Sequence, residues 1–244
     1  MSFSIDFYAA ISKHYREIFP LNPMQSSFVK GSFSTHSEKA LLDVGCGKGD
    51  LVLDLSTSFG LLTGIDLDSF MLEDARVAAP DNTRFMRLDM MNLIKQFEKG
   101  AFDGLLCFGN TLVHLPNRLS ISEFLQQAGI VLKGKGKLLL QIINYDRILD
   151  QDVRSLPTIE TENCSFVRNY RYDNKAHLVD FETRLSIKAS GESILNKIQL
   201  YPLLKTELHS MLLDAGFSSI SYFGNFKRDP LEKNSIPMVV EACI

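Results

Sequence analysis

The segment Asp43-Val44-Gly45-Cys46-Gly47-Lys48-Gly49, here called the glycine loop, decides the fold that we expect for this chain. It follows an apolar run that starts at Ala40 and precedes the amphipathic segment LVLDLST at residues 51–57. Glycine adopts backbone angles that other residues avoid, and it lets a ligand approach the main chain without a Cβ in the way. The amides at the start of the following helix carry partial positive charge. The segment therefore predicts a strand, a tight turn and a helix, with a ligand held against the main chain.

Outward from the loop, short apolar runs alternate with amphipathic segments, which is typical of parallel strands joined by helices. Five such runs are predicted strands: residues 40–45, 61–66, 83–89, 102–109 and 136–143. Helical spacing of apolar residues occurs in three intervening segments: 51–57, 69–79 and 119–132. Two more strands are predicted at the C-terminus: 217–223 and 238–244. Right-handed crossovers then give a doubly wound α/β fold with a seven-stranded, mostly parallel sheet.

The chain is expected to have three regions. They are an N-terminal helical cap at 1–39, a core at 40–143 and 203–244, and an antiparallel insertion at 144–202. In the cap, helices are predicted over residues 5–19 and 23–33, because prolines separate two segments with helical spacing.

The insertion follows the fifth core strand and shows the alternation of antiparallel strands. Residues 165–187 are predicted to form two strands around a turn at 173–175, and residues 194–201 to form a third strand. Beyond the insertion, Thr206 is predicted to cap a helix over residues 207–215.

Composition narrows the class of protein. With 45% hydrophobic and 23% charged residues, the 244-residue chain is expected to be globular, and a net charge of −3 gives no sign of a nucleic-acid partner. The most apolar run, at 138–143, is too short to span a membrane. The four cysteines lie far apart without metal-ligand spacing, so we expect reduced thiols, no metal and a cytoplasmic location.

The glycine spacing and the acidic residues favour one kind of ligand. The spacing is G-x-G-x-G, not the G-x-G-x-x-G of dinucleotide sites, and Asp43 would repel a phosphate but attract a cation. Asp66 ends the second strand, where its carboxylate can accept hydrogen bonds from the cis-diol of a ribose. Asp68 and Asp74 are interpreted as solvated charges at a helix start. Asp89 ends the third strand and Met90 follows it, and both are predicted to meet an adenine.

Taken together, these residues resemble the class I S-adenosylmethionine-dependent methyltransferases, over residues 41–143 and 204–244. The resemblance implies a Rossmann-like fold and S-adenosyl-L-methionine as cofactor. It places the glycine loop around the methionine moiety, Asp66 at the ribose, and residues 107–110 at the mouth where the methyl group is transferred. The cofactor-binding residues that it implies are Asp43, Gly45, Cys46, Gly47, Gly49, Asp66, Leu67, Asp89, Met90, Cys107 and Phe108.

Two further segments, CFGNTLVHLP at 107–116 and INYDRIL at 143–149, are similar to the glycine/sarcosine N-methyltransferase branch. In that branch an arginine immediately before Asn-Tyr-Asp clamps the carboxylate of the substrate, but here this residue is Ile143. Glycine itself is therefore not the expected acceptor, although Arg147, Arg168 or Arg171 can take over the clamp. The substrate-binding residues that we predict are Tyr15, Asn110, Tyr145, Arg168, Tyr170 and Tyr172.

Asn110 and His114 are the predicted catalytic residues. The amide oxygen of Asn110 can orient an acceptor amine, and a helix-cap role is the alternative. His114 can accept a proton near neutral pH, and the alternative is a structural role in a turn.

The sequence thus predicts a methyltransferase that transfers a methyl group to a small-molecule acceptor, preferably an amine, by in-line displacement. The alternatives are a non-catalytic module that binds a nucleoside or S-adenosylmethionine, and an NAD-dependent oxidoreductase. Glycine spacing and Asp43 argue against the oxidoreductase. The strand edges of the insertion also make a homo-oligomer a hypothesis to consider.

Overall fold

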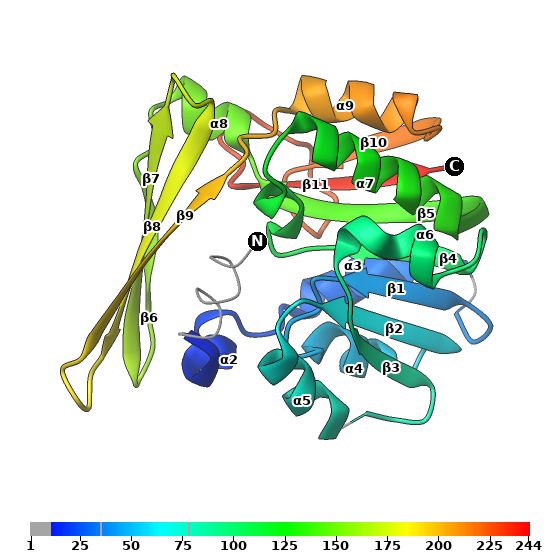
Figure 1. Cartoon of the computed structure of the whole chain (residues 1–244), viewed down its shortest axis with the longest axis horizontal. Coiled ribbons are helices and arrows are strands. Elements are labelled where there is room, and N and C mark those ends of the chain that lie inside the picture. Colours follow the sequence, from blue (N-terminus) through cyan, green and yellow to red (C-terminus); the bar gives the residue numbers. More distant parts are fainter. Residues whose placement is uncertain (1–10, 35, 78) are drawn as a thin grey trace.

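The computed structural model describes residues 11–34, 36–77 and 79–244. Its larger sheet has seven strands in the spatial order β10-β11-β5-β4-β1-β2-β3 (Figure 1). β11 is antiparallel to both of its neighbours, and the remaining neighbouring pairs are parallel. The strands are β1 (Ala40–Val44), β2 (Leu61–Asp66), β3 (Thr83–Arg87), β4 (Phe102–Cys107), β5 (Leu132–Ile143), β10 (Ser219–Phe223) and β11 (Pro237–Cys243). The predicted doubly wound α/β fold is confirmed.

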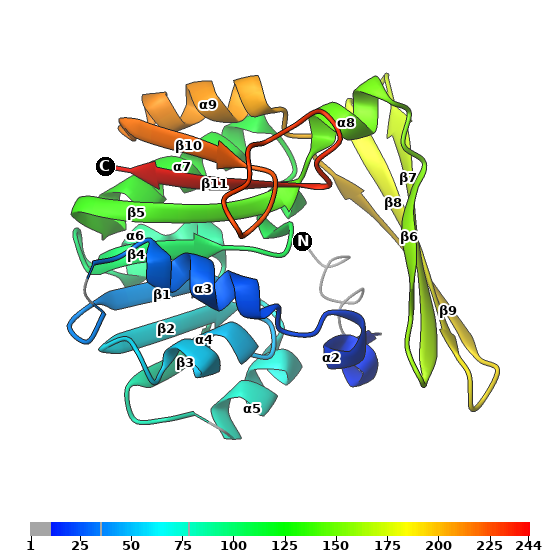
Figure 2. The same cartoon turned by 180° about the vertical axis from the view of Figure 1, so that it is seen from behind.

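Helices cover both faces of this sheet, as Figures 1 and 2 show from opposite sides. One face carries α3 (Pro23–Gly31), α4 (Asp50–Leu55) and α5 (Ser69–Val77), and the other carries α6 (Leu93–Gln96), α7 (Arg118–Val131) and α9 (Lys205–Asp214). Because side chains alternate along a strand, Leu41 packs in the core of the first face and Leu42 in that of the second. Strands buried on both sides are continuously apolar, which made them recognisable in the sequence. Within the described part of the chain, no helix is long and apolar enough to span a lipid bilayer.

A second sheet, here called the lid, lies beside the carboxyl ends of the parallel strands and close to the short helix α2 (Tyr15–Ile18) (Figure 1). The chain reaches it from β5 through α8 (Tyr145–Asp150). Its four antiparallel strands follow the order of the sequence: β6 (Ser155–Glu160), β7 (Cys164–Asp173), β8 (Leu178–Ile187) and β9 (Ser193–Leu200). The turn predicted at 173–175 joins β7 to β8.

The lid has one strand more than the sequence predicted. β6 was missed because it contains Pro157 and its pairing with β7 shifts between Leu156 and Ile159. Proline is tolerated there because β6 is an edge strand. The short helix α8 was also missed; the side chain of Asn144 caps it by accepting from the amide of Arg147.

Three smaller predictions need correction or fall outside the description. Thr206 does not cap α9, because the helix starts at Lys205, two residues before the predicted start. The carboxylate of Asp146 accepts a hydrogen bond of 2.9 Å from the amide of Lys205. β5 starts at Leu132 and not at Gly136. Residues 5–10 of the helix predicted over 5–19 lie outside the described residues. The described part forms a 3-10 turn, η1 (Ser12–His14), followed by α2.

Candidate active site

The glycine loop connects β1 to α4 in the conformation that its sequence predicted. Gly45 has a φ of 73° and Gly47 a φ of 53°, in the region that residues with a Cβ avoid. The amides of Gly45 and Cys46 both donate to the carbonyl oxygen of Ile65, at 2.8 and 3.0 Å. The loop is thereby fixed against the end of β2, with its main chain facing a pocket.

Asp66 links this loop to the next helix. One carboxylate oxygen accepts a hydrogen bond of 2.8 Å from the amide of Gly47, and the other accepts one of 3.0 Å from the amide of Asp68. Burial raises the pKa of Asp66 above its usual value. The position at the carboxyl end of β2 is the one that the sequence indicated, and the carboxylate is held by two main-chain donors.

Asp68 differs from its interpretation as a solvated charge. Its side chain is 3% exposed, and one oxygen accepts from the amides of Phe70 and Met71 at the start of α5. Asp74 is half exposed and forms ion pairs with Lys48 and Arg16. The first carboxylate is thus a buried helix cap, whereas the second is a surface ion-pair partner.

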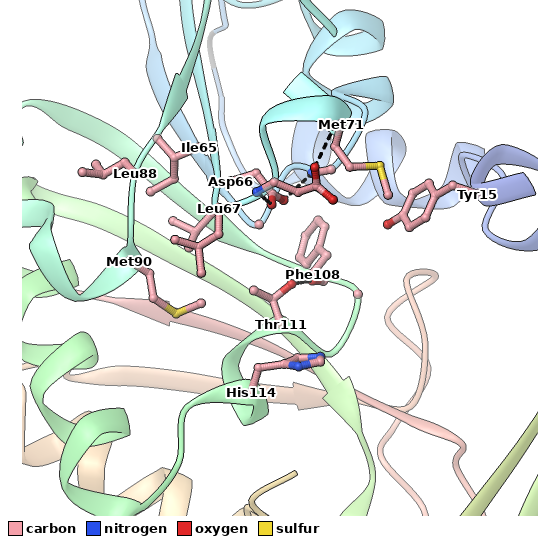
Figure 3. Close-up of a pocket in the computed structure, with 15 residues that line it drawn as sticks. Tyr15, Ile65, Asp66, Leu67, Met71, Leu88, Met90, Phe108, Thr111 and His114 are labelled. Atoms are coloured by element: carbon pink, nitrogen blue, oxygen red, sulfur yellow. Dashed lines mark hydrogen bonds between the residues drawn. The ribbon is translucent and has the colours of Figure 1, made fainter. Parts of the chain in front are cut away.

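The pocket in front of the loop is here called the glycine-loop pocket. Figure 3 shows Asp66 and Leu67 on one side of it, Met90 on another, and the ring of Tyr15 reaching in from α2. It is lined by Tyr15, Val44, Gly45, Gly47, Ile65, Asp66, Leu67, Asp68, Met71, Leu88, Met90, Phe108, Gly109, Thr111 and His114. A polar end at Asp66 and an apolar end at Leu88 and Met90 suit a ligand with a sugar and a flat apolar ring.

Five residues that the sequence assigned to the cofactor do not line this pocket: Asp43, Cys46, Gly49, Asp89 and Cys107. Asp43 and Cys46 line the second pocket described below, whereas Gly49 lines neither. The carboxylate of Asp89 caps the 3-10 turn η2 (Met90–Asn92), because it accepts a hydrogen bond of 2.9 Å from the amide of Met91. Cys107 is completely buried in the core. Its neighbour Phe108 does reach the pocket, because successive side chains of a strand point in opposite directions.

A second pocket, the lid pocket, continues from the first. It lies between residues 15–25 of the N-terminal segment, the glycine loop, residues 108–114 after β4, and three lid residues: Arg168, Tyr170 and Phe181. The residues that line both pockets are Tyr15, Gly45, Phe108, Gly109 and His114. Segments far apart in the sequence therefore meet around one continuous space.

Asn110 lies at the border of this space with its side chain already engaged. Its amide oxygen accepts a hydrogen bond of 2.9 Å from the amide of Ile143, and its amide nitrogen donates to the hydroxyl of Tyr145 at 3.2 Å. Asn110 is the N-cap residue of the 3-10 turn η3 (Thr111–His114), but its side chain makes no capping hydrogen bond to this turn. The left-handed backbone of Asn110, with a φ of 68°, turns the chain from β4 into η3.

His114 lines both pockets, and burial lowers the pKa of its imidazole to about 4. The ring is therefore neutral at pH 7, with a nitrogen lone pair and no positive charge. Tyr15 faces the same space, and burial together with the charge of Asp66 raises the pKa of its hydroxyl. Tyr15 therefore remains protonated at neutral pH.

The other predicted substrate residues separate into two groups. Arg168 and Tyr170 line the lid pocket, whereas Tyr145 is completely buried behind Asn110. Tyr172 bonds to the ring of His177 near the tip of the lid and lines neither pocket. Of the other two arginines considered for a clamp, Arg147 lines neither pocket, and Arg171 is exposed in an ion pair with Asp180.

Sequence reasoning missed several lining residues. Thr111 donates to the carbonyl oxygen of Phe108 at 2.7 Å, and Gln141 accepts from the amide of Gly109 at 2.9 Å. Thr111 is part of the segment that carried the resemblance, so its position after β4 was a usable signal. Phe181 and Phe19 reach the lid pocket through long-range packing, which no local sequence pattern indicates.

Comparison with known proteins agrees with this geometry. Residues 41–136 match the methyltransferase domain family. The chain is 26% identical over 205 residues to a glycine/sarcosine N-methyltransferase of Aphanothece halophytica, covering 82% of this chain and 74% of the relative. It is 29% identical over 136 residues to a ubiquinone biosynthesis O-methyltransferase of Histophilus somni, covering 53% and 56%. In fold it resembles an S-adenosylmethionine-dependent methyltransferase of Clostridium acetobutylicum, with a TM-score of 0.80, 14% identity, and coverage of 97% of this chain and 98% of that one.

The chain is a class I S-adenosylmethionine-dependent methyltransferase. S-adenosylmethionine is its cofactor. The donor set fits this cofactor, because the buried carboxylate of Asp43 in the glycine loop and the half-buried carboxylate of Asp66 beside it make positive charge favourable and a phosphate unfavourable. When bound, the cofactor supplies an activated methyl group on a positively charged sulfur.

Asp43 should make the stability of the ligand-free methyltransferase depend on pH. Burial, and then the charge of Asp66, raise the pKa of Asp43 from 3.8 to about 7. A raised folded-state pKa gives stability that is complete below the unfolded pKa and is lost as pH rises toward 7. We expect the free energy of unfolding of the wild type, relative to Asp43→Asn, to fall by up to about 1.4 kcal/mol per pH unit between these values.

Urea unfolding of both proteins between pH 4 and pH 7.5 measures this difference. Subtracting the free energy of unfolding of the variant removes the pH dependence that comes from carboxylates elsewhere in the chain, because both proteins contain them. A difference that does not change with pH would show that Asp43 is ionised in the ligand-free protein throughout this range.

Proposed function

We propose that this methyltransferase methylates a small molecule, with an amine as the favoured acceptor. The observation that carries the proposal is the continuity of the two pockets: five residues line both, so an acceptor beneath the lid would face the site of the activated methyl group. The relative from Aphanothece halophytica is named as an N-methyltransferase of glycine and sarcosine, which supports an amine. The lid closes the acceptor side, which favours a small molecule over a macromolecule.

The residues around the junction support a mechanism based on positioning. In-line displacement by an amine needs a neutral nucleophile, correct alignment and exclusion of water, and no protein nucleophile. His114 is neutral at pH 7 because burial lowers its pKa, so it adds no positive charge that would repel the positively charged sulfur of the cofactor.

Asn110 acts here as a positioning residue. Because its amide holds both the amide of Ile143 and the hydroxyl of Tyr145, it fixes the end of β5 and the start of α8 beneath the lid pocket. The sequence predicted that the amide oxygen of Asn110 orients the acceptor directly. The hydrogen bonds favour an indirect role, because that oxygen already accepts from the amide of Ile143.

Incubation with S-adenosylmethionine carrying a labelled methyl group, with mass-spectrometric detection in a pool of small metabolites, tests the proposal. We expect the label on the nitrogen of an amine-containing product, and no labelled product when S-adenosylhomocysteine replaces the cofactor. Label found only on oxygen would refute the amine preference. Cofactor binding without any labelled product would instead support the non-catalytic binding module.

A further inference from the structure

We propose that Arg168 in the lid is the anchor for an anionic group of the acceptor, so that the acceptor is a small molecule bearing a carboxylate or a phosphate. This inference rests on the proposed function of the lid pocket as the acceptor site. Beyond that function, it states that the acceptor carries a negative charge and names the residue that recognises this charge.

The first observation is the balance of charge in the lid pocket. Among the described residues that line it, Lys48 is paired with Asp74 at 2.7 Å, and His114 is neutral at pH 7. Arg168 has no carboxylate within ion-pair distance in the described part of the chain, although arginine stays charged in proteins. Two carboxylates also line the pocket, Asp43 and Asp50, but Asp50 pairs with Arg16 and neither carboxylate forms an ion pair with Arg168. A permanent positive charge therefore faces the space where the acceptor would bind, without a protein counterion in contact with it.

The second observation is the unused hydrogen-bonding capacity of this guanidinium. Its Nη2 donates to the carbonyl oxygen of Pro157 at 2.7 Å, which holds the side chain against the edge strand β6. Its Nε is buried and has no hydrogen-bond partner. A buried donor without a partner is unfavourable, and an anionic oxygen is the strongest acceptor that could satisfy it.

The third observation is a row of polar side chains across the lid. Strand pairing places Arg168 of β7 opposite Thr183 of β8, and Thr183 opposite Asn196 of β9. Directly paired residues of antiparallel strands point to the same face. Thr183 is 4% exposed, and its hydroxyl oxygen, like the side-chain nitrogen of Asn196, is buried without a partner.

The row lies between two apolar rows on the same face. One contains Tyr170, Phe181 and Ile198, and the other contains Phe166, Leu185 and Ile194. Tyr170 and Phe181 line the lid pocket, so this face of the lid is the one turned toward it. Three side chains that can all donate hydrogen bonds thus interrupt an apolar surface, and none of the three is acidic. Only Arg168 of the row lines the lid pocket, and Thr183 and Asn196, which line a separate pocket of the lid, extend the row away from it. This pattern fits recognition of an oxygen-rich anion and not of a cation.

Nuclear magnetic resonance of the arginine Nε–H groups tests the proposal without an acceptor of known identity. Sodium acetate and inorganic phosphate serve as separate probes, added to protein saturated with S-adenosylhomocysteine. The Nε–H signal that disappears in Arg168→Lys identifies the residue. We expect this signal to shift saturably with acetate if the anchor takes a carboxylate, or with phosphate if it takes a phosphate. Sodium chloride at the same ionic strength should not shift the Nε–H signal of Arg168.

Two variants make the result interpretable. Arg168→Gln should weaken binding of the active probe at least tenfold, and Arg171→Gln, which removes an exposed arginine of the same strand, should leave it within twofold. S-adenosylhomocysteine should bind both variants as it binds the wild type, which shows that they are folded. When an acceptor is known, Arg168→Gln should raise its KM at least tenfold and change kcat less.

The outcomes separate this inference from the proposed function. If S-adenosylhomocysteine binds and a labelled amine product forms, but neither anion shifts the Arg168 signal, the inference is wrong and the proposed function stands. An uncharged acceptor whose KM is the same with Arg168→Gln would also overturn it. If no small-molecule product forms at all, the proposed function fails first.

Discussion

Replacing Gly45 by alanine is expected to abolish measurable binding of S-adenosylhomocysteine and to lower the free energy of unfolding by about 2–4 kcal/mol. Gly45 has a φ of 73°, and a Cβ there would lie 2.5 Å from Cγ2 and 2.7 Å from Oγ1 of Thr111. Thr111 cannot easily move away, because its side chain is β-branched and bonded to the carbonyl oxygen of Phe108. The loop or η3 must therefore shift, and both line the glycine-loop pocket.

A matched control separates steric overlap from backbone strain. Gly191 has a φ of 70° in the turn between β8 and β9, and a Cβ there would have no neighbour within 4 Å. Gly191→Ala should therefore lower the free energy of unfolding by about 1–2 kcal/mol and leave ligand binding unchanged. Denaturant unfolding and titration calorimetry give both quantities. Equal effects of the two substitutions would contradict the contact between Gly45 and Thr111.

Asp66→Ala is expected to weaken S-adenosylhomocysteine binding by about 100-fold or more, because the substitution removes charge-assisted hydrogen bonds worth roughly 1.5–3 kcal/mol each. The carboxylate now fixes the amide of Gly47, and we propose that it also binds the ribose hydroxyls. Its loss therefore loosens the glycine loop and removes a direct ligand contact.

The control for this prediction is Asp68→Ala, two residues along the chain. Asp68 caps α5, so its loss should lower the free energy of unfolding by about 1 kcal/mol and change ligand affinity less than tenfold. Calorimetric titration of both variants at one pH compares them directly. Equal losses of affinity would remove the special role of Asp66 at the ribose.

The parts of the fold and site that were predictable from sequence depend on local patterns. Core strands such as β4 are apolar on both faces, and the glycine loop and Asp66 occupy fixed positions at strand ends. β6 was not predictable in this way, because Pro157 and a shifted pairing hide its alternation. Local patterns identify the elements that are regular and miss an irregular edge strand.

The assignments that failed or changed depend on long-range contacts. The burial of Cys107 and the capping role of Asp89 follow from which way each side chain points, and a shift of one residue reverses that direction. Asn110 was recognised as important, but its partners Ile143 and Tyr145 are more than thirty residues away in the sequence. The unpartnered Nε of Arg168 is visible only when the strands of the lid are paired.

The most direct test of the whole account is a crystal structure of the methyltransferase with S-adenosylhomocysteine. We predict the adenosyl group in the glycine-loop pocket, with the ribose hydroxyls at Asp66, the adenine near Leu88 and Met90, and the sulfur facing the lid pocket. A ligand bound elsewhere, or bound with its sulfur turned away from the lid pocket, would contradict the account.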